Sequence, residues 1–368
     1  MLKCNNIERT PQHFNMKSRN HGGDCYRNKI EYDFSININP FGMPRASMEA
    51  ACQGIRLSGR YPDERGEALR KALARKEGVS EENILLGNGA AELIYALCHS
   101  LRPKKALAPA PCFMEYESAT LAAGGKMTYY PLAEENGFNL DEGFLSAITE
   151  ETEVVFLCNP GNPTGRLTEQ QLLSEIALKC EKMGIWLCVD ECFLPFLRAE
   201  KELTMLGKLQ QLSHLVVLRA FTKVYGMPGL RLGYACLSSG ELLDKMKASM
   251  QPWNTSVPAQ MAGIAALQED ESYLEKTRRL IDEEKKYLVN ELSEGLAEKV
   301  IPSEANFILF KSRVDLQECL LKEKILIRDC SNFENLMEGY FRIGIRTHEE
   351  NAELIRRWKE AVRWQNPL

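Results

Sequence analysis

The amino-acid sequence predicts an α/β protein with a mainly parallel sheet and a smaller α+β part. Between residues 61 and 255, short apolar runs alternate with amphipathic helical patterns, as in strands joined by crossover helices. From residue 257 a helical pattern extends to about 297 and precedes a segment with fewer strands. We therefore expect residues 1–60 to form an N-terminal arm, 61–255 a large domain with helices on both sheet faces, and 256–368 a bridging helix and a small domain.

The individual elements follow from the same patterns in chain order. Buried strands of a parallel sheet are short and apolar throughout, because helices cover both faces. The expected strands lie near 84–86, 106–108, 127–131, 154–158, 185–189, 215–221, 231–237, 306–311 and 340–345. The expected helices lie near 46–57, 90–101, 257–297, 315–323 and 349–362.

Composition narrows the class of protein. The chain has 368 residues, 44% hydrophobic and 26% charged, with a net charge of −5, which is typical of a globular protein without a basic surface for nucleic acid. The twelve cysteines form no CxxC pair and the five histidines are scattered, so a metal site is not expected. The sequence has neither a secretory signal nor an apolar stretch long enough to span a membrane. We expect a cytoplasmic protein with no nucleic-acid, membrane or metal partner.

The segment RAFTKVYGMPGLRLGY, residues 219–234, carries the strongest chemical signal. Lys223 follows an apolar run, and a desolvated ε-amine has a lowered pKa and reacts readily with an aldehyde. Arg231 and Thr222 supply a cation and a hydroxyl suited to a phosphate. Lysine, hydroxyl and arginine together predict a pocket for pyridoxal 5'-phosphate (PLP). The alternative is a surface turn with a solvated Lys and Arg.

Two further strand ends support the cofactor pocket. Asp190 ends the apolar run IWLCVD, where ligands bind in open α/β sheets, and a carboxylate there can keep a pyridine nitrogen protonated. An Asp at this place is otherwise a helix cap or turn former. The run VVFLCNPGNPTG, residues 154–165, leads into a loop with two Asn-Pro pairs, and the amide of Asn162 is a candidate donor to the cofactor's ring oxygen.

A third segment, ILLGNGAAELIYALCHSL at residues 84–101, predicts a strand, a Gly-Asn-Gly turn and a helix. The first free N–H groups of that helix, near Ala90 and Ala91, would form an anion site. A single GxG turn is common, so its meaning depends on the other motifs. With Thr222 and Arg231 it would complete a phosphate-binding cup.

In this order, GNGAAE, NPGNPTG, VDE and TK…GLRLGY resemble the fold-type I PLP enzymes of the class I and II aminotransferase family. Other segments resemble the threonine-phosphate decarboxylases of cobalamin biosynthesis within that family. These segments are HGGD, DFSININPFGMP, RYPD, PCFMEYE, MQPWN, ILIRDCSNF and YFRIGIRT. The related histidinol-phosphate aminotransferases share the core motifs but lack the N-terminal HGG.

The resemblance implies roles for the motif residues. Lys223 would be the aldimine lysine, Asp190 the partner of the pyridinium, and Asn162 the ring-oxygen donor. Phe113 would stack on the cofactor ring, although an aromatic at this place is more often part of a core. Tyr61 would reach the cofactor phosphate of a neighbouring subunit, which implies a homodimer with shared active sites.

The resemblance also implies a site for a small phosphorylated amino acid. Its contacts would be His21, Gly22, Asn37, Asn162, Arg328 and Arg342. The alternative for Arg342 is a strand residue paired with a surface carboxylate, and for Arg328 a cation at a strand end. We expect both arginines to bind the substrate's phosphate, since a carboxylate held firmly by an arginine is stabilised against leaving as neutral CO2.

The chain departs from the family pattern in three places. Phe193 stands where aminotransferase relatives carry a tyrosine, which leaves Asn162 as the main ring-oxygen donor. Asp24 stands where the decarboxylases carry Asn, and its charge would oppose a phosphate unless it points away. The segment before His21 has no counterpart and is a candidate for disorder.

The expected activity is PLP-dependent decarboxylation of L-threonine O-3-phosphate to 1-aminopropan-2-yl phosphate. An aminotransferase is the main alternative, because the two reactions differ only in which bond to the α-carbon is broken. A catalytically silent PLP-binding domain of a transcription regulator is the remaining alternative, although no DNA-binding module precedes residue 33. Serine phosphate differs from threonine phosphate by one methyl group, so the motifs do not separate the two substrates.

Overall fold

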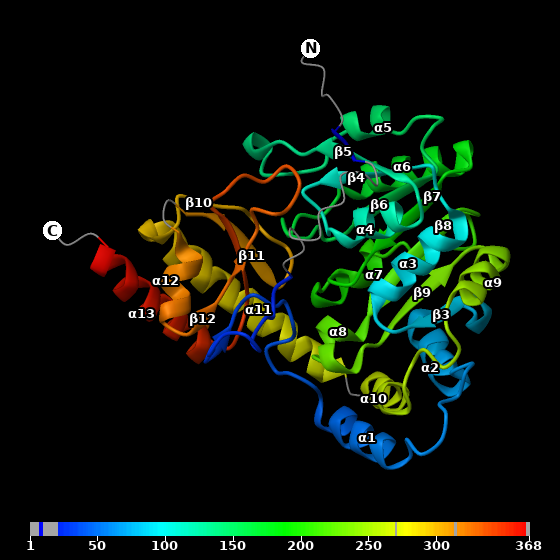
Figure 1. Cartoon of the computed structure of the whole chain (residues 1–368), viewed down its shortest axis with the longest axis horizontal. Coiled ribbons are helices and arrows are strands. Elements are labelled where there is room, and N and C mark those ends of the chain that lie inside the picture. The colour runs from blue at the N-terminus through cyan, green and yellow to red at the C-terminus, as the bar shows by residue number, and fades with distance from the viewer. Residues whose placement is uncertain (1–6, 10–20, 269–270, 313–314, 366–368) are drawn as a thin grey trace.

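An eight-stranded sheet forms the centre of the structure, a computed structural model that describes residues 7–9, 21–268, 271–312 and 315–365 (Figure 1). The strand order is β1-β5-β4-β6-β7-β8-β9-β3. The strands are β1 (Ile7–Arg9), β3 (Ile84–Gly87), β4 (Lys105–Ala110), β5 (Lys126–Pro131), β6 (Val154–Cys158), β7 (Trp186–Asp190), β8 (Leu215–Ala220) and β9 (Gly233–Leu237). Strands β5, β4, β6, β7 and β8 are parallel, whereas β9 is antiparallel to both of its neighbours and β1 is antiparallel to β5. The predicted mainly parallel α/β fold is confirmed.

Both faces of this sheet are buried, as the continuous apolar runs predict. Within β6, Val155 and Leu157 point into one hydrophobic cluster, whereas Val154 and Phe156 point into the other. The helices of this part are α2 (Glu67–Glu77), α3 (Ala90–Leu101), α4 (Glu115–Ala122), α5 (Gly143–Ala147), α6 (Gln170–Met183), α7 (Glu200–Leu203), α8 (Phe221–Val224) and α9 (Gly240–Ser249). Helices α3, α4 and α9 cover the face of Phe156, and α6 covers the opposite face.

A second sheet follows later in the chain and lies beside the first (Figure 1). It has the order β10-β11-β14-β13 and is antiparallel throughout. Its strands are β10 (Lys299–Val300), β11 (Phe307–Lys311), β13 (Arg328–Asp329) and β14 (Tyr340–Gly344), and β2 (Tyr32–Asp33) pairs separately with β12 (Ile325–Leu326). Helices α12 (Leu316–Lys322) and α13 (His348–Gln365) lie on the side away from the large sheet. The predicted domain division remains a prediction.

Three expectations about element limits need correction. Strand β8 ends at Ala220, and Phe221 already begins the short helix α8. Strand β9 begins at Gly233, because Arg231 has left-handed backbone angles (φ 58°) that end any strand there. The helical pattern of 257–297 contains two α-helices, α10 (Val257–Gln268) and α11 (Glu271–Glu291), and a π-helical turn at Leu292–Leu296, and residues 269–270 lie outside the described part.

These two helices have different neighbours. Helix α10 packs closely against α1 (Arg45–Arg56), where a Cβ on Gly54 would lie 2.6 Å from Cα of Pro258. Helix α11 instead contacts α13 and β11 of the second sheet. A periodic pattern cannot show this change of partner. Among the described residues, no helix is long and apolar enough to cross a membrane.

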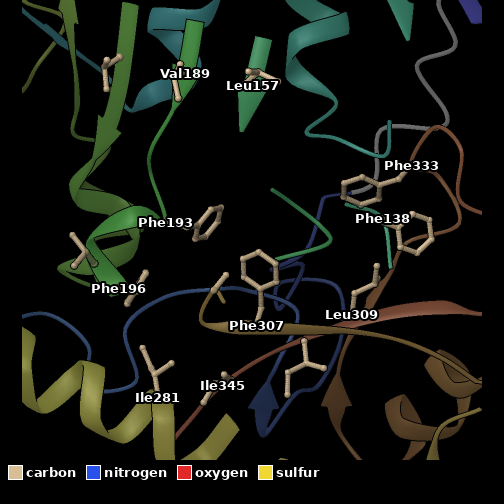
Figure 2. Packing of buried hydrophobic residues seen from close by; sticks show 14 of the residues in the cluster. Phe138, Leu157, Val189, Phe193, Phe196, Ile281, Phe307, Leu309, Phe333 and Ile345 are labelled. Atoms are coloured by element: carbon tan, nitrogen blue, oxygen red, sulfur yellow. The ribbon is translucent and has the colours of Figure 1, made fainter. Parts of the chain in front are cut away.

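The two sheets share one hydrophobic cluster (Figure 2). Phe193, just after β7, packs edge-to-face on Phe307 of β11 with ring centroids 5.0 Å apart. Figure 2 shows Val189 and Leu157 of the large sheet on one side of this contact. The contact therefore joins the second sheet to the carboxyl ends of the large sheet's strands, where α/β proteins bind ligands.

Candidate active site

A cavity of about 440 Å³ opens between the carboxyl ends of β7 and β8, the start of α3, and strands β13 and β14. It brings together almost all predicted site residues. Those in its walls are His21, Gly22, Asn37, Ala90, Ala91, Phe113, Asn162, Asp190, Thr222, Lys223, Arg231, Arg328 and Arg342. A larger cavity of about 880 Å³ beside Arg219 contains none of them.

Lys223 lies on the single helical turn of α8, directly after β8. The pKa of Lys223 is lowered to about 8, mainly by burial and next by the positive charge of Arg342. Its Nζ lies 5.9 Å from the ring centroid of Phe193, on an apolar surface. About a tenth of the amine is therefore neutral at pH 7, far more than for an ordinary lysine, and the neutral amine is the state that attacks an aldehyde.

Asp190 ends β7 and is 6% exposed. Its Oδ1 accepts a hydrogen bond from the backbone N–H of Cys192 at 3.0 Å, and its Oδ2 accepts one from the hydroxyl of Tyr116 at 2.8 Å. Tyr116 also stacks on Phe156 and meets Phe113 edge-on at 5.7 Å between centroids. Two donors thus hold the carboxylate in a fixed orientation.

Tyr116 was not among the predicted residues. Its signal in the sequence was its place three residues after Phe113 in the same PCFMEYE segment, at the start of a helical pattern. The pKa of Tyr116 is raised well above its usual value, mainly by burial and next by the negative charge of Asp190. Its hydroxyl therefore keeps its proton and remains a donor to Asp190.

The start of α3 and Arg231 form a compact cationic corner. Gly89 has φ 79°, and a Cβ there would lie 2.4 Å from Nη2 of Arg231. A Cβ on Gly233 would lie 2.6 Å from the backbone N of Ala90. Only glycine allows this close approach. The guanidinium of Arg231 contacts backbone oxygens but no described carboxylate, so the corner suits an anion such as a phosphate.

Arg328 and Arg342 face each other in register across β13 and β14. Nη1 of Arg342 donates to Oδ1 of Asn162, and Nη2 donates to the backbone oxygen of Ser35 at 3.0 Å. With its amide oxygen turned towards Arg342, Asn37 accepts from Nη1 at 3.1 Å. Asn37 and Ser35, the latter not predicted, thus orient the guanidinium, and the Asn162 amide keeps its N–H groups for another acceptor.

Arg328 donates to the backbone oxygen of Asp329 at 2.6 Å and to Oδ1 of Asn332 at 2.7 Å. Its guanidinium lies 5.1 Å from the ring centroid of Phe333. Burial lowers the pKa of Arg328, and burial together with Arg328 lowers the pKa of Arg342 to about 10. No described carboxylate pairs with either arginine, so the alternative of a surface ion pair for Arg342 is wrong. Two buried, uncompensated cations favour an anionic ligand.

The N-terminal arm reaches the same cavity. Nε2 of His21 lies 3.0 Å from Oε1 of Glu115, another residue that was not predicted. Asp24 forms an exposed ion pair with Arg27 at 2.7 Å and is not in the cavity wall, so its charge does not oppose an anion there. Of the segment before His21, residues 7–9 form β1, and the rest lies outside the described residues.

Tyr61 is the one predicted residue outside the cavity. It is 73% exposed and stacks on Trp253, with ring centroids 4.3 Å apart. Its role across a subunit interface remains a prediction. The roles of the cavity residues also remain predictions, although the structure brings their side chains together.

Comparison with known proteins agrees with this arrangement. The family model "Aminotransferase class I and II" matches residues 29–357. The chain is 36% identical over 326 residues to the threonine-phosphate decarboxylase of Salmonella typhimurium, covering 88% of this chain and 89% of that protein. It is 32% identical over 333 residues to the adenosylcobalamin biosynthesis bifunctional protein CobDQ of Leptospira interrogans, covering 88% of this chain and 38% of that protein.

The similarity extends to solved structures. The crystal structure of the histidinol-phosphate aminotransferase from Clostridium acetobutylicum aligns with a TM-score of 0.83 at 31% identity, covering 89% of this chain and 98% of that one. The family match spans the second sheet, all of the large sheet except β1, and every residue of the cavity wall from Ser35 onward. The chain belongs to the class I and II aminotransferase family.

Proposed function

We propose that this chain is a PLP-dependent decarboxylase that converts L-threonine O-3-phosphate to 1-aminopropan-2-yl phosphate and CO2. Similarity to the Salmonella typhimurium decarboxylase supports the reaction, and similarity to the Leptospira interrogans protein supports a place in cobalamin biosynthesis. The cytoplasm is the proposed compartment, since the eleven cysteines of the described part are all unpaired, as in a reducing environment.

One observation carries the proposal: a single cavity contains two separate cationic corners near one lysine. Arg231 with the start of α3 forms the first, and Arg328 with Arg342 forms the second. The charges of Arg342 and Arg231 both contribute to the lowered pKa of Lys223, so both corners are close to its amine. Such a site suits a phosphorylated cofactor and a phosphorylated substrate together.

The cavity residues fit PLP. The glycine-lined approach of Arg231 to the start of α3, together with Thr222, would hold its phosphate. Asp190, held by two donors, would face its ring nitrogen, and the N–H groups of Asn162 its ring oxygen. When bound, PLP supplies an electron-withdrawing ring that takes up the electron pair left when a bond to the α-carbon breaks.

The protein's own residues decide which bond breaks. Arg328 and Arg342 would bind the substrate's phosphate and leave its carboxylate weakly held. A carboxylate locked in a bidentate arginine pair would have to lose that stabilisation as it leaves. Lys223, with a pKa of about 8, can hold a proton at Nζ and return it to the α-carbon.

Transamination of a phosphorylated amino acid remains a second candidate, favoured by the similarity to the Clostridium acetobutylicum enzyme. Product analysis separates the two. The holoenzyme is incubated with L-threonine O-3-phosphate, with and without a 2-oxo acid. We expect CO2 and the phosphorylated amine at equal rates in both reactions. A product that requires the 2-oxo acid, with no CO2, would identify an aminotransferase.

The proposed assembly is a homodimer with shared active sites. Several large apolar side chains are exposed on or near α1 and beside Tyr61. They are Met48 (53% exposed), Ile55 (64%), Leu57 (39%) and Trp253 (42%). An apolar surface of this kind is usual at a protein interface. A second copy covering it would bring Tyr61 towards the partner's cavity.

A further inference from the structure

Glu115 and Asp190 are the two acidic residues in the wall of a cavity that also holds four cationic side chains, Lys223, Arg231, Arg328 and Arg342. Glu115 is the first residue of α4 and is 9% exposed. Its Oε2 accepts a hydrogen bond from the hydroxyl of Tyr95 on α3 at 2.9 Å, and its Oε1 lies 3.0 Å from Nε2 of His21. The carboxylate is therefore fixed on one side by the large sheet's helices and bound on the other to the N-terminal arm.

The arm is fitted tightly to the second sheet's side of the cavity. A Cβ on Gly22 would lie 2.5 Å from the backbone oxygen of Ser35, so only glycine fits there. The N–H of Gly23, with φ 88°, donates to Oγ of Ser35 at 2.7 Å. The backbone oxygen of Ser35 in turn accepts from Arg342. Residues 21–23 thus connect Ser35, which binds Arg342, with Glu115, which contacts His21.

The contact with His21 explains how the carboxylate of Glu115 is tolerated in a cavity that would bind a phosphate. An unpaired buried carboxylate would repel a phosphate in the same cavity. The contact with His21 gives this carboxylate a partner and holds the imidazole next to Phe113, with ring centroids 6.3 Å apart. The side chain of His21 is 50% exposed. Its contact with Glu115, here called the clasp, therefore holds it at the cavity.

We propose that Glu115 is a positioning residue for phosphate recognition, which clasps His21 of the N-terminal arm against the cavity through the contact between their side chains. The inference rests on the proposed function, since His21 is a predicted contact of the substrate's phosphate. It adds that His21 and Glu115 act as one unit. Removing either should weaken phosphate binding, and removing both should not be worse than removing His21 alone.

A double-mutant cycle on the holoenzyme tests this coupling. Glu115→Gln, His21→Ala and the double variant are compared with the wild type for KM and kcat with L-threonine O-3-phosphate. We expect Glu115→Gln to raise KM about tenfold with little change in kcat, which corresponds to one charge-assisted hydrogen bond. His21→Ala should raise KM at least as much, because it also exposes the charge of Glu115. The double variant should bind no more weakly than His21→Ala.

A second measurement detects the clasp without turnover. Hydrogen exchange of the backbone amides of residues 22–25 should accelerate in Glu115→Gln and in His21→Ala, because the arm loses its contact with α4. Tyr95→Phe should have a smaller effect in the same direction. The matched control is Glu117→Gln on the same helix, which is not in the cavity wall and should change neither exchange nor KM.

The outcomes are separable from those of the proposed function. If the wild type does not act on threonine phosphate, the proposed function fails, whereas arm exchange still reports on the clasp. If the wild type is active, additive losses in the double variant would show that Glu115 acts independently of His21. Unchanged arm exchange in Glu115→Gln would likewise overturn the clasp.

Discussion

Replacement of Asp190 by Asn should leave stability nearly unchanged and replacement by Ala should lower it, whereas both replacements should slow turnover to a similar extent. Both oxygens of Asp190 accept hydrogen bonds, from the fixed N–H of Cys192 and from the rotatable hydroxyl of Tyr116. In Asp190→Asn the amide oxygen can accept from Cys192, and the amide N–H can donate to Tyr116 once its hydroxyl turns. The hydrogen bonds survive and only the charge is lost.

The magnitudes follow from these contacts. Asp190→Asn should change the free energy of unfolding of the apoprotein by less than about 1 kcal/mol, since no buried donor loses its acceptor. Asp190→Ala leaves two buried donors without an acceptor, which costs about 1–3 kcal/mol each, or about 2–6 kcal/mol together. Both variants lack the anion that we propose to face the ring nitrogen. Removing one member of a buried ion pair costs about 3–5 kcal/mol, which slows turnover by roughly a hundredfold to a few thousandfold.

Urea unfolding of the apoproteins and steady-state turnover of the holoenzymes measure the two effects separately. The reasoning is refuted if Asp190→Asn turns over near the wild-type rate, because another group would then protonate the ring. Equal stability of the Asn and Ala variants would also refute it, because the two hydrogen bonds would then carry no stability. Tyr130→Phe is a matched control for loss of a tyrosine–carboxylate hydrogen bond away from the cavity.

Other residues of the cavity lead to further predictions. Lys223→Ala should abolish both the visible absorbance of lysine-bound cofactor and turnover, and cofactor that borohydride still fixes to the variant would reveal a different lysine. Because burial lowers the pKa of Lys223 to about 8, the rate at which the apoprotein captures PLP should rise with pH through about 8 and level off above it, as the neutral amine becomes the main form; a flat rate from about pH 7 to 9 would contradict this. Arg328→Ala should raise KM for threonine phosphate by about tenfold or more, while hardly changing the weak binding of unphosphorylated threonine; equal losses would place this arginine on the carboxylate. If Tyr61 acts across a dimer, coexpressed Lys223→Ala and Tyr61→Ala chains should form mixed dimers with one intact site and measurable activity, whereas an active monomer would exclude it.

The motifs at strand ends could be predicted because their geometry is local. A short apolar run followed by Asp190, Asn162 or Lys223 already places the side chain at the carboxyl edge of a parallel sheet, and all three lie in one cavity. The same reasoning was wrong for Arg231, which was expected on a strand but lies before β9. Its backbone is left-handed and its guanidinium packs against Gly89 at the start of α3, and a local apolar pattern shows neither feature.

Residues that act through tertiary contacts could not be found in this way. Tyr116 and Glu115 lie in a motif that drew attention only to Phe113, and their partners, Asp190 and His21, lie far away in the chain. Several strands were also missed, among them the two-residue β12 and β13, because two residues are too few to show a period. Yet β13 carries Arg328 into register with Arg342.

Carboxyl-labelled L-threonine O-3-phosphate, incubated with the holoenzyme in deuterium oxide, tests the central claim most directly. The account predicts that the label leaves as CO2 and that the phosphorylated amine gains a single deuterium on the carbon that lost it, with no 2-oxo acid present. Retention of the label in a 2-oxo acid, or label release that requires an amino-group acceptor, would contradict decarboxylation and identify the site as that of an aminotransferase.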